Sequence, residues 1–485
     1  MTDIAEIALR QLLDLAAKER PRWLTLEGGP VAMKTRFHAE EAAAAALAAT
    51  GLMAAELWRL RGGQAQEVAV ATREAAAALT SYHHLVFADP DKAPPMPAGP
   101  GGGGRTPAIG FFPTRDGRWI FLHPSFPDSA AKLHRLVGEP VDRADAARKV
   151  MGWDALDLEN AIAEAGVCGA MVRTAEEWDH SEQGRVLAAR PVVEVVKIAD
   201  SPPEPLPGRG DGPLSGVRTL DLTRVLAGPT CARTLAQYGS DVLYITGPDL
   251  PSTPRFVTDT NHGKLSAFLD LKSEDGRKHL TELLKDADVF SQGYRAGALD
   301  RLGFSPLELA RIRPGIITIA INAYGHEGPW RHRPGWEQLA QTVTGMAEAH
   351  GRHIVRDEEG PMLQPGAVTD YTTGFLAALG GMIALERRAR YGGSYLVRVS
   401  LSQTGVWIRK LGVAGPERIA AVQPLSPEEI EGFRVESQTG FGGLKHLRPA
   451  VRMSATPPRW TRPVVPLGTH APAWPAPASA DLTPA

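Results

Sequence analysis

One aspartate, Asp370, combines a reactive side chain with a position that could orient it for nucleophilic chemistry. It directly precedes a predicted helix over residues 371–390 and lies at or near the N-cap of that helix. The helix dipole and the free backbone N–H groups stabilise a carboxylate there, so we expect Asp370 to be ionised and held in place. The same spacing is equally typical of an ordinary N-cap, and the pattern alone favours neither interpretation.

A second chemically suggestive feature is a tetraglycine at residues 101–104, inside the Gly/Pro-rich stretch 88–107. Because glycine has no side chain, Gly102 and Gly103 would let the backbone approach a reacting group and donate N–H bonds to an oxyanion. Such a loop can also exclude water from a reactive intermediate. The alternative is a flexible linker, which the composition by itself favours.

Strands that alternate with helices would position these groups. The pattern predicts strands at 217–222, 241–245, from 288 and at 316–321, with intervening helices at 229–238, 274–286 and 305–312. This alternation is typical of βαβ units, so we expect an α/β fold with a large Rossmann-like domain and a mainly parallel sheet. Ligands bind such sheets at the carboxyl ends of the strands, which directs attention to the loops that follow them.

The segment before residue 200 has a different organisation. Residues 39–60 are predicted to form an alanine-rich helix, and residues 108–123 are typical of a β-hairpin that turns at Asp116-Gly117. Further helices are predicted at about 128–137 and 155–165. We therefore expect a second, smaller α+β domain in this part of the chain.

Composition excludes several classes of protein. The 485 residues include 53 Lys+Arg and 55 Asp+Glu, a net charge of -2 that gives no basic surface for nucleic acid or an anionic membrane. A hydrophobic content of 43% argues against extensive disorder. The sequence shows neither a signal-peptide core nor a run of about 18 apolar residues, so we expect a cytoplasmic protein.

Cysteine and histidine spacing predicts neither a disulfide framework nor a metal site. Cys168 and Cys231 are far apart and form no CxxC motif. His262, His326 and His332 have no ligand spacing to a second histidine or a cysteine. Each of these histidines is more typical of a structural or exposed residue, and we expect no bound metal.

An internal repeat relates residues 48–70 to residues 377–399 at a constant offset of 329, with ten of 23 positions identical. Each copy is predicted to form a helix of small residues, a glycine turn and a Val-x-Val strand, which favours a true duplication. Chance similarity between two alanine-rich helices is the alternative. At the same offset Glu41 corresponds to Asp370, and we interpret Glu41 as a relic or a structural residue.

Between residues 214 and 468 the chain contains a series of distinctive blocks: LSGVRTLDLTRVLAGPTCARTLAQYGSDVLYI, NHGKLSAFLDLKSEDGR, ADVFSQGYRAGALDRLGF, INAYGHEGPWRHRPGWEQLAQTVTG, VTDYTTGFLAALGGMIALERRARYGGSYLVRVSL and SATPPRWTRPVVPLG. In content and order they resemble the family III CoA-transferases, a group that includes formyl-CoA and carnitine-CoA transferases and α-methylacyl-CoA racemase.

The N-terminal part resembles the same family out of order. In the family, a small domain that opens with a tetraglycine follows the alanine-rich helix and its Val-x-Val strand. Here that material is residues 39–200, with GPGGGGRTP, FFPTRDGRWIFLHP and AEAGVCGAMVRTAEEW. The resemblance therefore implies a permuted arrangement, in which the small domain precedes the large one.

The resemblance implies that Asp370 is the nucleophile, because the nucleophilic aspartate of the family belongs to this block. It would attack an acyl-CoA thioester to give a mixed anhydride, and the CoA thiolate would return to form an aspartyl-CoA thioester. Glu337, beside Trp336, matches an acidic residue close to the family's active site, and Gly102 and Gly103 match its mobile lid. Acyl-CoA and a small carboxylic acid are the implied substrates, with no permanently bound cofactor.

The carboxyl ends of the predicted strands and the resemblance to the family together imply a set of CoA-binding residues. They are Arg224, Val225, Leu226, Ala227, Lys264, Tyr294 and Arg301. The first four follow the first strand, where the backbone can meet pantetheine or adenine. Arg301 suits a phosphate but is also typical of a solvated arginine. After the second strand, Ile245-Thr246 stands where many family members carry a glutamate, so the part of the implied CoA site that would hold adenine departs from the family pattern.

Two alternatives remain open. An α-methylacyl-CoA racemase uses an Asp/His pair in which the His belongs to a Gly-His-Asp run, but Trp336 occupies that position in Gly335-Trp336-Glu337. A non-catalytic CoA-binding homologue would not need Asp370. Family members are interlocked homodimers, so the resemblance also implies a homodimer.

The predicted organisation has six parts. They are a helical segment with a partial repeat (1–87), a small α+β domain (88–200), a linker (201–216), a large Rossmann-like CoA-binding catalytic domain (217–410), a closing segment that returns to the large domain (411–470) and a disordered tail (471–485).

Overall fold

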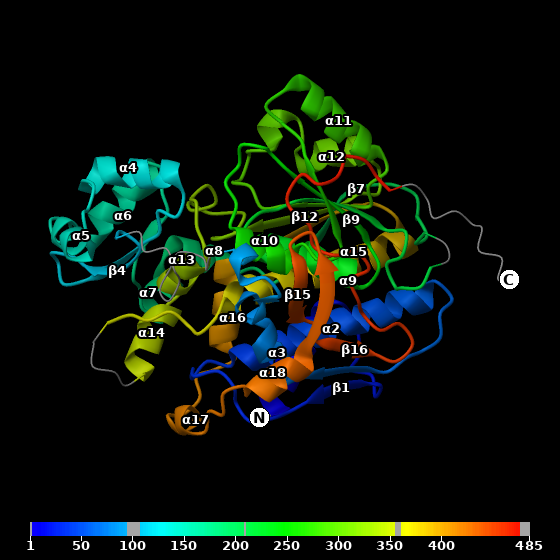
Figure 1. The fold of residues 1–485 in the computed structure, drawn as a ribbon, viewed down its shortest axis with the longest axis horizontal. Coiled ribbons are helices and arrows are strands. Elements are labelled where there is room, and N and C mark those ends of the chain that lie inside the picture. Colours follow the sequence, from blue (N-terminus) through cyan, green and yellow to red (C-terminus); the bar gives the residue numbers. More distant parts are fainter. Residues whose placement is uncertain (1, 95–106, 208–209, 355–359, 476–485) are drawn as a thin grey trace.

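The computed structural model describes residues 2–94, 107–207, 210–354 and 360–475 (Figure 1). Within these residues the largest sheet has seven strands in the order β10-β9-β8-β11-β12-β13-β7. Their bounds are β10 Lys264–Phe268, β9 Asp241–Thr246, β8 Arg218–Leu222, β11 Val289–Gln292, β12 Ile317–Asn322, β13 Ser394–Ser400 and β7 Glu194–Ala199. In this described sheet all neighbours pair in parallel except β7, which is antiparallel to β13. The mainly parallel α/β sheet expected from the sequence is confirmed.

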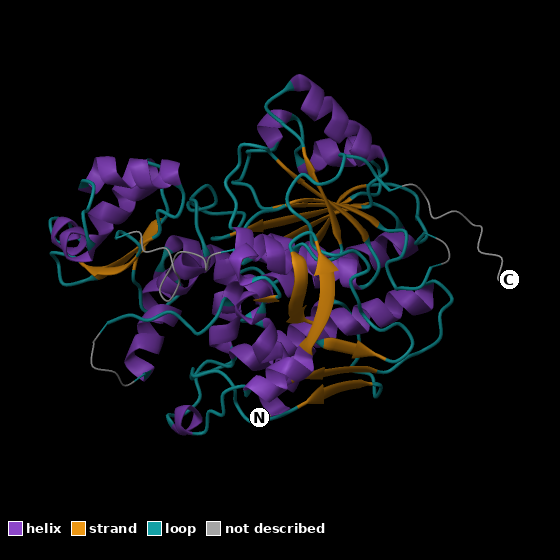
Figure 2. Ribbon diagram, in the orientation of Figure 1, coloured by secondary structure: helices purple, strands orange, loops and turns teal. Residues whose placement is uncertain are grey.

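Helices cover both faces of this sheet (Figure 2), as strands that are apolar on both sides require. On one face lie α9 (Ala227–Gln237) and α15 (Val368–Tyr391), whose apolar side chains share the main core with β12. On the other face lie α11 (Glu274–Lys285) and α12 (Pro306–Ile312), which form a second core with β8 and β11.

The order of the strands reverses between β8 and β11. The chain runs outward from β8 through β9 to β10, then returns to β11 and continues through β12 to β13. Such a reversal leaves a crevice at the carboxyl ends of the two central strands, where ligands of open α/β sheets bind. Strand β10 was not among the predicted strands, because the polar Lys264 and Ser266 interrupt its apolar pattern.

The two repeat copies fold alike, each as a long buried helix followed by a strand. The first copy is α2 (Ala39–Leu60) with β2 (Val68–Ala71), and the second is α15 with β13. A Cβ added to Gly51 would lie 2.7 Å from Val68 Cγ1, and one added to Gly380 would lie 2.5 Å from Val397 Cγ1. The identical glycines and valines of the repeat thus make the same close helix-to-strand contact twice, as a true duplication predicts.

A small separate core forms between residues 108 and 171, to the left in Figure 1. Its antiparallel sheet, in the described residues, consists of β4 (Gly110–Pro113), β5 (Trp119–Leu122) and β6 (Gly169–Met171). The helices α4 (Pro127–Val137), α5 (Arg143–Val150) and α6 (Ala155–Glu164) pack on it. The expected hairpin turns at Asp116-Gly117, where Gly117 has φ +74°. The chain then leaves this unit and contributes β7 to the large sheet.

The closing segment joins the N-terminal part before it reaches the large sheet. The strands β14 (Arg434–Thr439) and β15 (Gly442–Leu447) form a sheet with β3 (Val86–Phe87), and β16 (Val451–Met453) pairs with β2 beside β1 (Leu24–Glu27). The chain then follows the edge of the large sheet, where Gly263 N donates to Arg462 O at 2.9 Å. Trp474 Nε1 donates to Leu283 O at 3.0 Å, so residues 471–475, the described part of the expected disordered tail, are ordered.

The remaining helices of the described residues complete the layers. They are α1 (Thr2–Leu15), α3 (Thr72–Ala78), η1 (Ser81–His84), η2 (Pro90–Lys92), α7 (Ala175–His180), α8 (Glu182–Ala188), α10 (Pro254–Thr260), η3 (Asp300–Leu302), α13 (Glu337–Val343), α14 (Met346–His353), α16 (Leu401–Lys410), α17 (Glu417–Ala420) and α18 (Pro427–Phe433). Among the described helices α15 has the length and hydropathy of a membrane span, but 94% of that stretch is buried inside the fold, as in a core helix.

Candidate active site

Asp370 lies at the end of α15 that faces the carboxyl edge of the large sheet. A turn through Gly392 and Gly393 joins α15 to β13, so helix and strand run in opposite directions. The helix begins at Val368 with Ala367 as its N-cap, which makes Asp370 the third residue of the first turn. This corrects the expectation that Asp370 precedes the helix. Its side chain is buried, with 9% of the residue surface exposed.

Glu337, the first residue of α13, accepts hydrogen bonds from the free backbone N–H groups at the start of α15. Its carboxylate accepts the backbone N–H of Asp370 at 2.7 Å and that of Thr369 at 3.0 Å. Gln341 Nε2 donates a third hydrogen bond at 2.6 Å. Glu337 is buried, so these bonds replace the water that its carboxylate has lost. The acidic residue singled out in the sequence therefore caps the helix that carries Asp370.

The two buried carboxyl groups influence one another. Burial, and then the negative charge of Glu337, raise the pKa of Asp370 well above its ordinary value. Burial also raises the pKa of Glu337, but its three hydrogen bonds favour the ionised form. Of the two carboxyl groups, Asp370 is therefore the more readily protonated. The expectation that free N–H groups at the helix start stabilise the Asp370 carboxylate is corrected, because those of Thr369 and Asp370 bind Glu337.

The loop after β8 reaches α15 one turn beyond Asp370. A Cβ on Gly374 would lie 2.6 Å from Ala227 O and 2.6 Å from Thr230 Cβ, so glycine permits this close approach of α9. Within the loop, Val225 has φ +69°, a strained conformation for a β-branched residue that is typical of functional sites. The loop that carries Arg224, Val225, Leu226 and Ala227 thus contacts the helix of Asp370 through Ala227.

Lys264 does not take the place that the sequence suggested. Its side chain is fully buried, and its ammonium group lies 2.8 Å from Asp221 Oδ2 and 2.9 Å from Pro229 O. Asp221 also accepts the backbone N–H of Thr223 at 3.0 Å. The expected phosphate contact is therefore corrected: Lys264 neutralises a buried carboxylate and supports the loop from beneath.

An open pocket of about 690 Å³ lies at the carboxyl ends of β8 to β11, beside the crevice of the sheet. Its wall is mostly apolar and includes Leu222, Ile245, Leu250, Leu269, Tyr294, Leu299 and Leu302. Thr246 belongs both to this wall and to that of a smaller hollow lined by Arg224 and Val225. Tyr294 lines this pocket, whereas Arg301 is exposed and is not among its lining residues, so the CoA contacts expected of both stay predictions.

The small unit contributes aromatic side chains that sequence reasoning missed. The Trp336 ring lies 5.7 Å from the Phe126 ring and 6.2 Å from the His123 ring, measured between centroids. The guanidinium of Arg224 lies 5.8 Å from the Phe126 centroid. Burial lowers the pKa of His123 to about 4, so this imidazole is neutral. His123 and Phe126, two aromatic residues just after β5, were the sequence signal that could have indicated these contacts. The tetraglycine with Gly102 and Gly103 lies outside the described residues.

A network from the N-terminal part reaches the same helix turn and was also missed. Tyr371, the neighbour of Asp370, donates its hydroxyl to Asp259 Oδ2 at 2.8 Å. Asp259 Oδ1 accepts the hydroxyl of Ser81 at 2.5 Å and pairs with Arg233 at 3.0 Å. No sequence pattern links these positions, since Ser81 and Asp259 are 178 residues apart.

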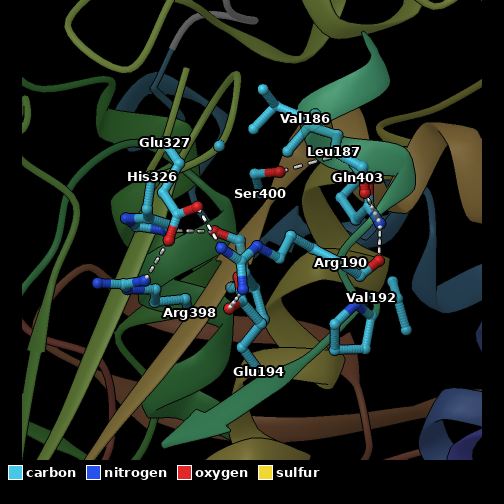
Figure 3. A pocket seen from close by; sticks show the side chains of 13 residues that line it. Val186, Leu187, Arg190, Val192, Glu194, His326, Glu327, Arg398, Ser400 and Gln403 are labelled. Carbon is cyan, nitrogen blue, oxygen red and sulfur yellow. Dashed lines mark hydrogen bonds and ion pairs between the residues drawn. The ribbon is translucent and has the colours of Figure 1, made fainter. Parts of the chain in front are cut away.

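Other charged clusters are neutralised internally. Figure 3 shows a hollow between β7 and the end of β13 in which Glu327 bridges Arg190 and Arg398. Glu194 adds a second carboxylate to this cluster, so its charges balance. Among the described residues, no three His, Cys, Asp or Glu side chains converge in a way that could hold a metal ion.

Comparison with known sequences identifies the class of protein. The sequence profile of CoA-transferase family III matches residues 13–203 and 214–421. The chain therefore belongs to CoA-transferase family III, as its resemblance indicated.

Individual relatives match parts of the chain. An acetyl-coenzyme A transferase, nodX, from Hypoxylon pulicicidum is 33% identical over 323 residues, which cover 62% of this chain and 54% of that protein. A formyl-CoA:oxalate CoA-transferase from Rhodopseudomonas palustris is 34% identical over 43% of this chain and 50% of its own length. The chain spans about half the length of the curated relatives it matches. Among solved structures, a hypothetical protein (Rv3272) from Mycobacterium tuberculosis has 28% identity and a TM-score of 0.39, covering 42% of this chain and 59% of its own.

Proposed function

We propose that this protein transfers CoA from an acyl-CoA donor to a carboxylic acid acceptor, with Asp370 as the nucleophile. The observation that carries the proposal is the pair of Asp370 and Glu337 at the start of α15, one turn from the strained loop around Val225. Family membership supports the same chemistry.

The reaction would proceed through two kinds of aspartyl intermediate. The ionised Asp370 attacks the thioester carbonyl carbon, the C–S bond breaks, and a mixed anhydride and CoA thiolate result. The thiolate attacks the Asp370 carbonyl carbon and releases the donor acid as a carboxylate, which leaves an aspartyl-CoA thioester. The acceptor carboxylate then attacks the aspartyl-CoA thioester and releases the CoA thiolate, which leaves a mixed anhydride of Asp370 and the acceptor. The thiolate attacks the acceptor carbonyl of this anhydride, so the new acyl-CoA forms and the Asp370 carboxylate is regenerated. Because the pKa of Asp370 is raised, it must lose its proton before the first attack.

Other residues would bind and orient the coenzyme. The apolar pocket with Tyr294 suits the adenine ring, and the loop from Arg224 to Ala227 suits the pantetheine arm. The exposed Arg301 is the predicted phosphate contact. Glu337 would fix the first turn of α15, and Gly102 and Gly103 would cover the anhydride. No residue of this scheme requires a permanently bound cofactor.

Trapping with hydroxylamine tests the proposal. After incubation with acyl-CoA, peptide mass spectrometry should find a hydroxamate on Asp370 and none without acyl-CoA. The variant Asp370→Asn should show neither adduct nor transfer, whereas Glu41→Gln, altered at the equivalent position of the first repeat copy, should retain both. Intact acyl-CoA binding without any Asp370 adduct would refute the mechanism and favour a non-catalytic homologue.

Racemisation is less consistent with the site. Trp336 occupies the position where a racemase carries its histidine, and the nearby His123 is buried with a pKa of about 4. Incubation of a 2-methylacyl-CoA in deuterated water provides the discriminating measurement, since a racemase incorporates deuterium at the α-carbon and a CoA-transferase does not.

The proposal extends to the organisation of the molecule. We propose a cytoplasmic homodimer in which the small unit precedes the large sheet domain in permuted order, with boundaries near residues 88, 201, 217 and 411. The buried, unpaired thiols of Cys168 and Cys231 fit a reducing compartment. Light scattering of the purified protein measures the oligomeric state directly.

A further inference from the structure

The segment of residues 81–85 comes from the N-terminal part of the chain, yet it is fixed against the first turn of α15. The backbone N–H of Tyr82 donates to the hydroxyl of Tyr371 at 3.1 Å, across 289 residues of sequence. Tyr371 directly follows Asp370. The segment therefore packs against the side chain of the residue that follows the proposed nucleophile.

Several further bonds hold this segment in place. Ser81 donates to Asp259, the same carboxylate that accepts the Tyr371 hydroxyl. Arg255 Nε donates to Tyr82 O at 2.9 Å, and another nitrogen of its guanidinium donates to Leu85 O at 3.2 Å. A short turn held by buried, charge-assisted hydrogen bonds has little freedom, which is what a group that must face a reaction centre requires.

The Tyr82 side chain is partly buried and oriented by its neighbours. Its ring packs edge-on against Phe256 at 4.9 Å and against His83 at 4.2 Å between centroids. Within the described part of the chain its hydroxyl has no hydrogen-bond partner, and it is not enclosed by protein. Burial, and then the charges of Glu337 and Asp370, raise the pKa of Tyr82, so the phenol keeps its proton.

We propose that Tyr82 donates a hydrogen bond to the carbonyl oxygen of the acyl-CoA thioester while Asp370 attacks it. Negative charge develops on that oxygen as the C–O bond to Asp370 forms, and a fixed neutral donor stabilises it. The proton stays on Tyr82 throughout, so no acid or base is consumed. The inference rests on the proposed function and adds a residue of the N-terminal part to the reaction centre.

The variant Tyr82→Phe tests the donor, because it removes the hydroxyl but retains the ring and the backbone N–H that holds Tyr371. We expect kcat to fall about 100-fold, as for the loss of one oxyanion donor, with acyl-CoA affinity and thermal stability unchanged. Tyr391→Phe is the matched control, since Tyr391 lies at the far end of α15 and is 69% exposed. A Tyr82→Phe enzyme with the wild-type kcat would overturn the inference.

A second measurement separates donation from a structural role. A fluorinated tyrosine at position 82 keeps the shape of the ring and lowers the pKa of the phenol. A donor role predicts that activity is retained near neutral pH and lost at a lower alkaline pH than in the wild type, whereas an unchanged alkaline limb contradicts it. If the wild-type protein forms no Asp370 adduct, the proposed function fails and this inference with it. If the adduct forms equally in Tyr82→Phe, only this inference fails.

Discussion

The carboxylate of Glu337 accepts the backbone N–H of Asp370 at 2.7 Å, so the residue that caps α15 also carries the charge that, after burial, raises the pKa of the proposed nucleophile. One contact thereby does two things. It fixes the orientation of the first helical turn, and it raises the pKa of Asp370.

Glu337→Gln should move the acid limb of the pH–rate profile to lower pH. Asp370 must be ionised to attack, so wild-type activity rises as the pH rises through the raised pKa of Asp370. Glutamine retains an oxygen for the N–H of Asp370 but removes the charge that contributes to the raised pKa. Measurement of kcat/KM against pH gives the position of the acid limb in each protein, and Glu337→Asp is the charge-conserving control. An unmoved limb in Glu337→Gln would show that this charge does not act on Asp370.

Asp370→Asn should abolish transfer and increase stability. The folded-state pKa of Asp370 is raised above 3.8, so its contribution to folding is favourable below that pH and is lost as the pH rises through the folded value. We expect the neutral variant to be about 1–3 kcal/mol more stable at pH above neutrality and no more stable in acid. Urea unfolding at both pH values measures this difference. Asp275→Asn, in the exposed first turn of α11, should change neither quantity.

Lys264→Met should destabilise the fold without removing a phosphate contact. It leaves Asp221 buried and unpaired, which costs about 3–5 kcal/mol in other proteins. Because Asp221 also holds Thr223, we expect the loop with Val225 to loosen and the KM for acyl-CoA to rise. Thermal unfolding and kinetics check the two effects. A variant with wild-type stability but weakened binding of CoA relative to dephospho-CoA would restore the phosphate role.

Arg418→Met should destabilise the start of α2 without creating a second nucleophile. Arg418 binds both oxygens of Glu41, at 2.7 and 2.9 Å. Although burial raises the pKa of Glu41, its bonds to His38 and Arg418 hold it below the ordinary 4.5. This stabilisation is present above pH 4.5 and is lost as the pH falls through the folded value. Unfolding at neutral and acid pH measures it, and a hydroxamate on Glu41 in either protein would contradict a structural role.

His262→Phe should make the protein less sensitive to acid. His262 is fully buried, its ring lies 3.9 Å from that of His446, and burial lowers its pKa well below 6.5. The unfolded chain binds a proton near pH 6.5 while the folded chain does not, so stability falls as the pH drops below that value. Melting temperatures between pH 8 and 5 should therefore decline less in the variant. A parallel decline in both proteins would exclude His262 as the cause.

Much of the architecture was predictable because its determinants are local. Alternating apolar strands and helices predicted the parallel sheet, and the repeat predicted two equivalent helix–strand units. The repeat could be interpreted from sequence because the contacts that define each unit, of Gly51 with Val68 and of Gly380 with Val397, join residues close in sequence. Strand β10 escaped prediction because its buried Lys264 is tolerated only through Asp221, a partner 43 residues away.

The fold class, the family and Asp370 and Glu337 as residues of interest could all be predicted from the residues alone. The surroundings of these two carboxyl groups depend on the tertiary structure. Burial and the approach of Glu337 to the first turn of α15 raise the pKa of Asp370, and long-range packing brought Tyr82 to the neighbouring Tyr371 and removed Lys264 from solvent. Desolvation and distance control pKa and hydrogen bonding, and both depend on contacts between segments that no local pattern relates.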